Sequence, residues 1–147
     1  MSRLQALCAK QDRSHKEIHD KLHEWGIFYN DADQIVGKLI EDNFLNEERY
    51  ARSYARGKFR MNAWGRRRIV QELKMERVSE YCIRKALTEI REDDYLETLQ
   101  QVIDKKMSQL DKEEHPSKTK MKVAAYAIGR GFESELVWKL LNFTGEE

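Results

Sequence analysis

The sequence has few of the residues that interrupt helices or cross-link a chain. Its 147 residues include one proline, seven glycines and two cysteines. So few breakers permit a chain that is nearly all helix, and no stretch shows the strict alternation typical of a half-buried strand. Two cysteines are too few for a disulfide framework, so we expect Cys8 and Cys82 to be small buried side chains in a reducing compartment.

Long hydrophobic runs are also missing. The mean hydropathy is −0.82, with 40% hydrophobic and 36% charged residues. No apolar run reaches the length of a membrane span, and the N-terminal residues lack the apolar core of a signal peptide. We therefore expect a cytoplasmic protein that does not use a membrane.

Motifs of catalysis are absent from the sequence as well. It contains no GxxxxGK[ST], GxSxG, HExxH or CxxC pattern. His15, His19 and His23 recur every fourth residue on one helical face, a pattern that a solvated helix surface explains as well as a metal site does. We expect no enzyme activity, no cofactor and no metal ion.

What the sequence does contain is a concentrated positive charge in its middle. Residues 49–77 hold ten Lys or Arg and two acidic residues, a local charge of +8, whereas the whole chain is +1. Residues 92–114 hold eight acidic residues and three lysines, a local charge of −5. A basic segment of this density indicates an anionic partner, although solvated helix faces also produce such patterns.

The basic segment begins with a predicted helix from Asn46 to Met61. Asn46 can cap it, and the acidic residues that follow suit a helix N-terminus. At 100° per residue its arginines share one face, opposite an apolar seam that includes Tyr50, Tyr54 and Met61, while Phe59 lies near the arginines. Tyr50 and Tyr54 are better explained by packing than by stacking on bases, whereas Trp64 lies at a turn.

The next predicted helix carries three consecutive arginines. Arg66 lies on the same side as Ile69 and Leu73, while Arg67 and Arg68 point outward. Arginine suits an anionic partner because its fork binds phosphate or carboxylate through two hydrogen bonds. The candidate contact residues for a partner or DNA are Arg49, Arg52, Arg56, Lys58, Arg60, Arg66, Arg67, Arg68 and Lys74. This interpretation requires that the arginines face outward and do not neutralise acidic residues of the same chain.

An apolar pattern recurs three times along the chain. Each copy has two apolar residues four apart, then another five residues later: Ile18, Leu22 and Ile27; Ile69, Leu73 and Val78; Val123, Ala127 and Phe132. The copies are 51 and 54 residues apart. We expect an all-α fold of elongated, tandem three-helix, helix-turn-helix-like units, which cover residues 1–61, 62–113 and, incompletely, 114–147.

Four motifs in this order resemble the RecX family, over about residues 4–141. They are Asn43-Phe44-Leu45-Asn46-Glu47-Glu48-Arg49-Tyr50-Ala51; Gly65-xxx-Ile69-xxx-Leu73; Arg130-Gly131-Phe132; and Arg13-Ser14-xx-Glu17-xxx-Lys21-Leu22. The signature residues Tyr50, Ala51, Gly65, Ile69, Leu73, Gly131 and Phe132 are expected to be structural. One departure is Arg77, which stands where the family's turn usually has glycine.

The resemblance implies tandem three-helix repeats and a role as a negative regulator of the RecA recombinase. Such proteins bind in the groove of the RecA–DNA filament and inhibit its extension, its ATPase, strand exchange and the coprotease activity of the SOS response. Two mechanisms remain open for the basic residues: docking between recombinase subunits, with DNA phosphate contacted in passing, or primary binding to single- or double-stranded DNA. An adaptor for an unrelated acidic protein is a third interpretation.

Overall fold

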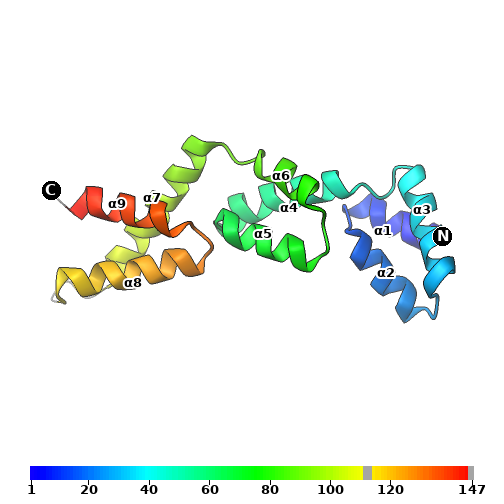
Figure 1. Ribbon diagram of the computed structural model, residues 1–147, viewed down its shortest axis with the longest axis horizontal. Coiled ribbons are helices and arrows are strands. Elements are labelled where there is room, and N and C mark those ends of the chain that lie inside the picture. The colour runs from blue at the N-terminus through cyan, green and yellow to red at the C-terminus, as the bar shows by residue number, and fades with distance from the viewer. Residues whose placement is uncertain (111–113, 146–147) are drawn as a thin grey trace. The chain divides into compact units, whose positions relative to one another are not determined.

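The computed structural model describes residues 1–110 and 114–145, with side chains up to residue 142, and this part of the chain is all helical (Figure 1). The predicted polar break between the later helices falls partly on residues 111–113, outside the described residues. None of the described helices is long and apolar enough to cross a membrane. The helices are α1 (Ser2–Lys10), α2 (His15–Glu24), α3 (Tyr29–Glu41), α4 (Glu47–Asn62), α5 (Arg66–Met75), α6 (Glu80–Leu87), α7 (Glu92–Gln109), α8 (Pro116–Gly129) and α9 (Ser134–Gly145).

Side-chain caps fix where α2, α4 and α6 begin, and the cap at Asn46 was predicted. The Ser14 hydroxyl accepts the Glu17 N–H at 3.0 Å, and the Glu17 carboxylate accepts the Ser14 N–H at 3.2 Å. Asn46 accepts the Arg49 N–H at 2.9 Å, and Ser79 accepts the Cys82 N–H at 3.3 Å. These bonds satisfy N–H groups that have no partner inside the helix.

The recurring apolar pattern corresponds to one turn geometry used three times. At the ends of α2, α5 and α8 an N–H bonds to the carbonyl five residues earlier: Ile27 to Leu22 at 2.9 Å, Val78 to Leu73 at 3.1 Å and Phe132 to Ala127 at 3.2 Å. The residue before each donor has a left-handed φ: 78° at Gly26, 60° at Arg77 and 103° at Gly131. The same cap therefore forms at Arg77 without glycine, at the steric cost of a Cβ in this region.

The chain divides into two compact units. Unit 1 comprises Met1–Arg56 and Glu72–Glu89, and unit 2 comprises Gly57–Gln71 and Ile90–Glu147. In unit 1, α2 packs on α3 around a buried apolar cluster. That cluster consists of Leu4, Cys8, Ile18, Leu22, Ala32, Val36, Leu39 and Leu45. The Ser14 hydroxyl also donates to Glu76 at 2.8 Å, which ties the start of α2 to the residues after α5.

In unit 2, α7, α8 and α9 pack on one another (Figure 1). Tyr95 is fully buried at the centre, with ring centroids 5.9 Å from Phe59 and 5.2 Å from Phe132. Two predictions for α4 were wrong: Phe59 is buried, and Met61 is 87% exposed. The ring of Tyr95 covers Phe59, and a helical projection of α4 alone contains no information about that neighbour.

Candidate nucleic-acid and partner interface

The arginines on the first half of α4 lie beside carboxylates of unit 1. The Arg49 Nε bonds to Asp12 at 2.6 Å. Arg52 donates to Glu48 at 3.0 Å and to Glu89 at 2.9 Å, and Arg56 donates to the other oxygen of Glu89. The hydrogen bond that Arg52 donates to Glu48, together with the one it donates to Glu89, outweighs desolvation and raises the pKa of Arg52. Arg49, Arg52 and Arg56 therefore form ion pairs with acidic residues of the same chain. They do not meet the requirement that the candidate arginines face outward to a partner.

Arg66 at the start of α5 is also occupied within its own unit. Its guanidinium lies 3.8 Å from the centroid of the Tyr95 ring, donates to Glu133 at 2.9 Å and pairs with Glu92. Burial alone would lower the pKa of Arg66, but the hydrogen bonds to Glu133 and Glu92 outweigh that effect and raise it. Arg66 therefore joins the start of α5 to α7 and to the residue before α9.

The two arginines after it have different surroundings. Arg67 is exposed and has no carboxylate partner within residues 1–110 and 114–145. The Arg68 guanidinium lies 4.0 Å from the centroid of the Trp64 ring, and the Lys58 ammonium lies 4.9 Å from the same centroid. Trp64 thus holds two cations close together by cation–π attraction.

The position of these arginines is fixed by backbone contacts inside unit 2. The N–H groups of Gly65 and Arg67 donate to the carbonyls of Arg130 and Gly131, both at 2.9 Å, and the Arg66 N–H donates to the Tyr95 hydroxyl at 3.0 Å. These N–H groups are therefore not available to an external anion. Cations in the first turn oppose the helix dipole, so Arg67 and Arg68 are not explained by the stability of α5.

Gly65 and Gly131 permit this contact because neither carries a side chain. A Cβ at Gly65 would lie 2.2 Å from the Gly131 carbonyl carbon, and one at Gly131 would lie 2.4 Å from the Arg68 Cβ. The remaining signature residues are at most 8% exposed and lie in the packed interior: Tyr50, Ala51, Ile69, Leu73 and Phe132. The motifs thus mark the packing that holds the basic helices.

Arg60 and Lys74 complete the set of predicted contact residues. Both are exposed, and neither has a carboxylate partner among the residues that the structure describes. Lys74 and Arg67 are seven residues apart on α5 and so share one face of that helix. We define the open cationic set as four of the predicted contact residues for which the described ranges hold no carboxylate partner: Arg60, Arg67, Arg68 and Lys74.

The histidines and cysteines show no sign of reactive chemistry. His19 lies 3.9 Å from Asp33, and the His23 ring lies 5.0 Å from that of Phe28. No group of three or more potential metal ligands occurs among the described residues. Both cysteines are buried and free, and desolvation raises the pKa of Cys8 and of Cys82 above the usual thiol value. Raised thiol pKa values oppose nucleophilic roles.

Sequence reasoning missed the residues that occupy the arginines. Glu89 and Asp12 lie outside the basic segment, 37 residues from Arg52 and from Arg49. Glu133 is 67 residues from Arg66. No local pattern predicts such pairs, because they depend on which helices pack together. A signal was available only for Glu48, four residues before Arg52, at the spacing typical of helical ion pairs.

Comparisons with known proteins agree with this architecture. The model for the second three-helix domain of RecX matches residues 46–87, and that for the third matches residues 92–141. A regulatory protein RecX from Caldanaerobacter subterraneus subsp. tengcongensis is 30% identical over 139 residues, 94% of this chain and 66% of that protein. One from Vibrio parahaemolyticus is 28% identical over 141 residues, 96% of this chain and 88% of that protein.

Solved structures show the same fold. A crystal structure of a regulatory protein RecX superposes with a TM-score of 0.85 at 23% identity, covering 96% of this chain and 68% of that one. RecX from Lactobacillus salivarius also gives 0.85, at 19% identity, covering 99% and 97%. The predicted repeat boundaries at residues 61 and 113 stay a prediction. With both domain models matched in order, the chain belongs to the RecX family of regulatory proteins.

Proposed function

We propose that this protein is a negative regulator of the RecA recombinase, which binds the groove of the RecA–DNA filament. It would inhibit filament extension, ATP hydrolysis, strand exchange and the SOS coprotease activity, and so act in DNA repair in the cytoplasm. The observation that carries the proposal is the ordered match of both RecX domain models to residues 46–87 and 92–141. The role requires binding and no catalysis by this chain.

Within unit 2, Arg60, Arg67 and Arg68 of the open cationic set are the residues that we assign to the filament. Arg67 and Arg68 are held in place by the Gly65–Gly131 contact, yet their charges have no carboxylate partner in the described part of the chain. A fixed, uncompensated charge loses little freedom when an anionic partner binds. Arg49, Arg52, Arg56 and Arg66 would first have to leave ion pairs, so we assign them a smaller share of the contact.

The second candidate function is direct DNA binding with little need for the recombinase. The observation in its favour is the half-buried Trp64 ring between Lys58 and Arg68, since aromatic rings flanked by cations are used to bind single strands. Duplex binding would lose affinity with salt at a slope of about −0.9 per neutralised phosphate. Filament docking would instead require RecA and depend less steeply on salt.

The test is a RecA ATPase assay on single-stranded DNA, with this protein titrated from substoichiometric amounts. We expect inhibition well below one molecule per recombinase, because a regulator that blocks filament growth affects many subunits at once. Added DNA that carries no RecA separates the two functions: it should not relieve inhibition by a filament-docking protein. An unchanged ATPase rate at stoichiometric amounts would contradict the proposal.

A further inference from the structure

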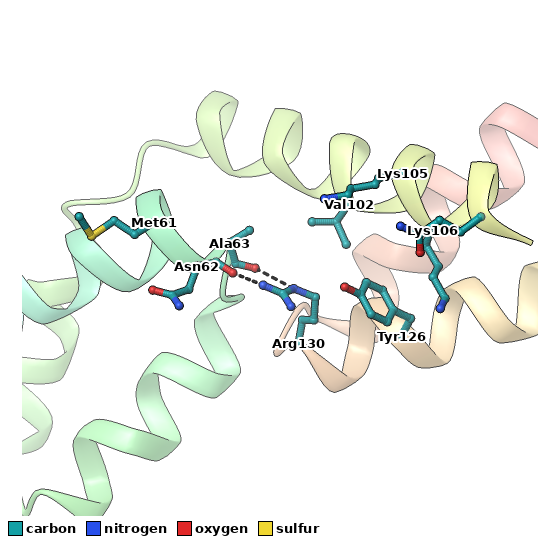
Figure 2. Close-up of a pocket in the computed structure, with 9 residues that line it drawn as sticks. Met61, Asn62, Ala63, Val102, Lys105, Lys106, Tyr126 and Arg130 are labelled. Atoms are coloured by element: carbon teal, nitrogen blue, oxygen red, sulfur yellow. Dashed lines mark hydrogen bonds between the residues drawn. The ribbon is translucent and has the colours of Figure 1, made fainter.

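A second cationic site lies in unit 2, beside the end of α4. The ends of α4, α7 and α8 enclose a hollow of about 290 Å³ (Figure 2). Three of its lining side chains are cations, one is aromatic, and none of the described residues that line it is acidic. They are Met61, Asn62, Ala63, Val102, Lys105, Lys106, Gln109, Tyr126 and Arg130. Its cations are unexpected, because α7 begins a segment whose overall charge is negative.

Arg130 forms part of the wall of the hollow and bonds to the end of α4. Its guanidinium donates to the carbonyl of Ala63 at 3.3 Å and to that of Asn62, as the dashed lines in Figure 2 mark. These carbonyls end α4, where Ala63 has a φ of 51° and no helical N–H remains to satisfy them. Arg130 therefore caps α4 from another helix, and its Nε and Nη2 atoms are already used.

The ammonium groups of the two lysines in the hollow can donate hydrogen bonds to a ligand. Lys105 is exposed, and neither it nor the half-buried Lys106 forms an ion pair with any described residue. The Lys106 ammonium lies 4.8 Å from the centroid of the Tyr126 ring, and the Arg130 guanidinium lies 5.8 Å from it. Tyr126 is itself 40% exposed. Positive charge and an accessible aromatic side chain therefore occur together at one site.

We propose that this hollow binds a phosphodiester segment of single-stranded DNA, with the phosphate at Lys105 and Lys106 and the nucleoside against Tyr126. A flat carboxylate is best recognised by a free arginine fork, whereas lysine acts as a point charge on phosphate. Two nitrogens of the Arg130 guanidinium already donate to carbonyls at the end of α4. The site therefore offers positive charge without a free guanidinium fork. Cations beside an aromatic ring are the usual elements of single-strand binding.

The size of the hollow and its apolar walls agree with this ligand. A volume of about 290 Å³ is close to the lower limit of about 300 Å³ for small-molecule pockets, which suits one nucleotide. Val102 and the 87% exposed Met61 offer apolar surface beside the lysines. The site rests on the second candidate function, direct DNA binding, for which it names contact residues other than Trp64.

Direct binding of a fluorescein-labelled oligothymidylate, measured by anisotropy over a range of salt concentrations without RecA, tests the proposal. The variant Lys105→Gln/Lys106→Gln should bind more weakly. Its log–log salt slope should flatten by about 0.7, because the single phosphate that both lysines contact contributes about 0.7 for a single strand. Lys118→Gln/Lys139→Gln removes two exposed lysines of α8 and α9 and is the matched control, expected to keep the wild-type slope.

A second variant separates charge from stacking. Tyr126→Leu should weaken binding at an unchanged salt slope, because it removes the ring and no charge. Helicity measured by circular dichroism should stay at the wild-type level in all three variants, since each altered side chain is at least partly exposed.

Three outcomes would overturn the proposal. The first is no binding of the oligonucleotide by the wild type at low salt. The second is an equal slope for the lysine variant and the wild type, in which case the lysines only offset the dipole at the end of α7. The third is displacement of the oligonucleotide by a polyglutamate peptide at lower concentration, dependent on the same lysines, which would assign the hollow to an acidic protein. None of these outcomes depends on inhibition of the RecA ATPase.

Discussion

The arginines of α4 and those at the start of α5 are alike in the sequence and differ in their surroundings. Arg52 and Arg56 share the carboxylate of Glu89, whereas Arg67 and Arg68 have no acidic partner in the described part of the chain. The local charge of the basic segment therefore overstates the charge available to a partner. Availability depends on the opposite helix, and only the packed structure shows which arginines remain open.

The largest effect on this comparison should come from Gly65→Ala. The added Cβ would lie 2.2 Å from the Gly131 backbone, so the contact that holds Arg67 and Arg68 has to open. We expect a loss of roughly 3 kcal/mol in the free energy of unfolding, at the upper end of overpacking costs. The measurement is urea unfolding followed by circular dichroism.

Gly57→Ala is the matched control for that variant. Gly57 lies within α4, and a Cβ there meets nothing within 4 Å. Replacing a helical glycine by alanine stabilises by about 0.5–1 kcal/mol. A Gly65→Ala protein as stable as the Gly57→Ala protein would show that the Gly65–Gly131 contact does not fix the start of α5.

A comparable loss is expected for Leu73→Ala, on the part of α5 that belongs to unit 1. Leu73 is fully buried, and its carbonyl accepts the N–H that closes the turn at Arg77. Truncation of a buried leucine costs about 2–5 kcal/mol. Met75→Ala, at a 64% exposed position on the same helix, should change the unfolding midpoint little. An unchanged midpoint for Leu73→Ala would remove this residue from the core.

Tyr95→Phe tests the hydrogen bonds that the Tyr95 hydroxyl forms with the Arg66 N–H and with Glu133. The Tyr95 hydroxyl donates to Glu133 and accepts the Arg66 N–H. Without it a partly buried N–H and carboxylate lose their partner, at a cost of about 1–3 kcal/mol. Tyr81→Phe, which removes a hydroxyl from a 54% exposed ring, is the control. Equal stability of the two variants would contradict this account of Tyr95.

The same variant should change the alkaline stability. Burial first, and then the hydrogen bond to Glu133, raises the pKa of Tyr95, so folding favours its neutral form. The linked stability is fully present below the ordinary tyrosine pKa of about 10 and is lost as the pH rises above it. Tyr95→Phe should reduce this loss, and Tyr50, whose pKa burial also raises, should retain part of it. A loss as steep as in the wild type would contradict the shift.

The smallest effect is expected from Glu89→Gln, which removes the carboxylate that two arginines of α4 share. Half-exposed ion pairs contribute little to stability, so the melting temperature should move less than in Tyr95→Phe. Inhibition of the RecA ATPase should strengthen, because Arg56 loses its ion pair, while Arg52 keeps its ion pair with Glu48. Glu80→Gln removes the same charge from an exposed position on α6 and should leave inhibition unchanged. Weaker inhibition by Glu89→Gln would indicate that Glu89 itself contacts the partner.

The parts of the fold that the sequence predicted are those fixed by neighbouring residues. The predicted cap at Asn46 forms through a bond that spans three residues, and Ser14 and Ser79 cap their helices in the same way. Arg77 shows that the apolar spacing predicted the turn better than the glycine did. Local hydrogen bonds and local apolar periodicity need no knowledge of tertiary packing.

Tertiary neighbours account for what the sequence did not predict. Phe59 is buried because Tyr95 covers it, 36 positions further along the chain. Arg130 matched a family motif, but its role as the cap of α4 depends on two carbonyls nearly seventy residues away. The sequence did not predict the hollow at Lys105 and Lys106, because their segment is acidic overall. Only the arrangement of the helices places these lysines apart from the acidic side chains.

The most direct test of the central claim compares two double variants in the RecA ATPase assay on single-stranded DNA. Arg67→Gln/Arg68→Gln and Arg52→Gln/Arg56→Gln each remove two positive charges and leave the Cβ atoms in place. We predict that the α5 variant needs a far higher concentration to inhibit, while the α4 variant stays close to the wild type. Equal loss in both, or a larger loss in the α4 variant, would contradict the claim that unpaired arginines, rather than total charge, make the contact.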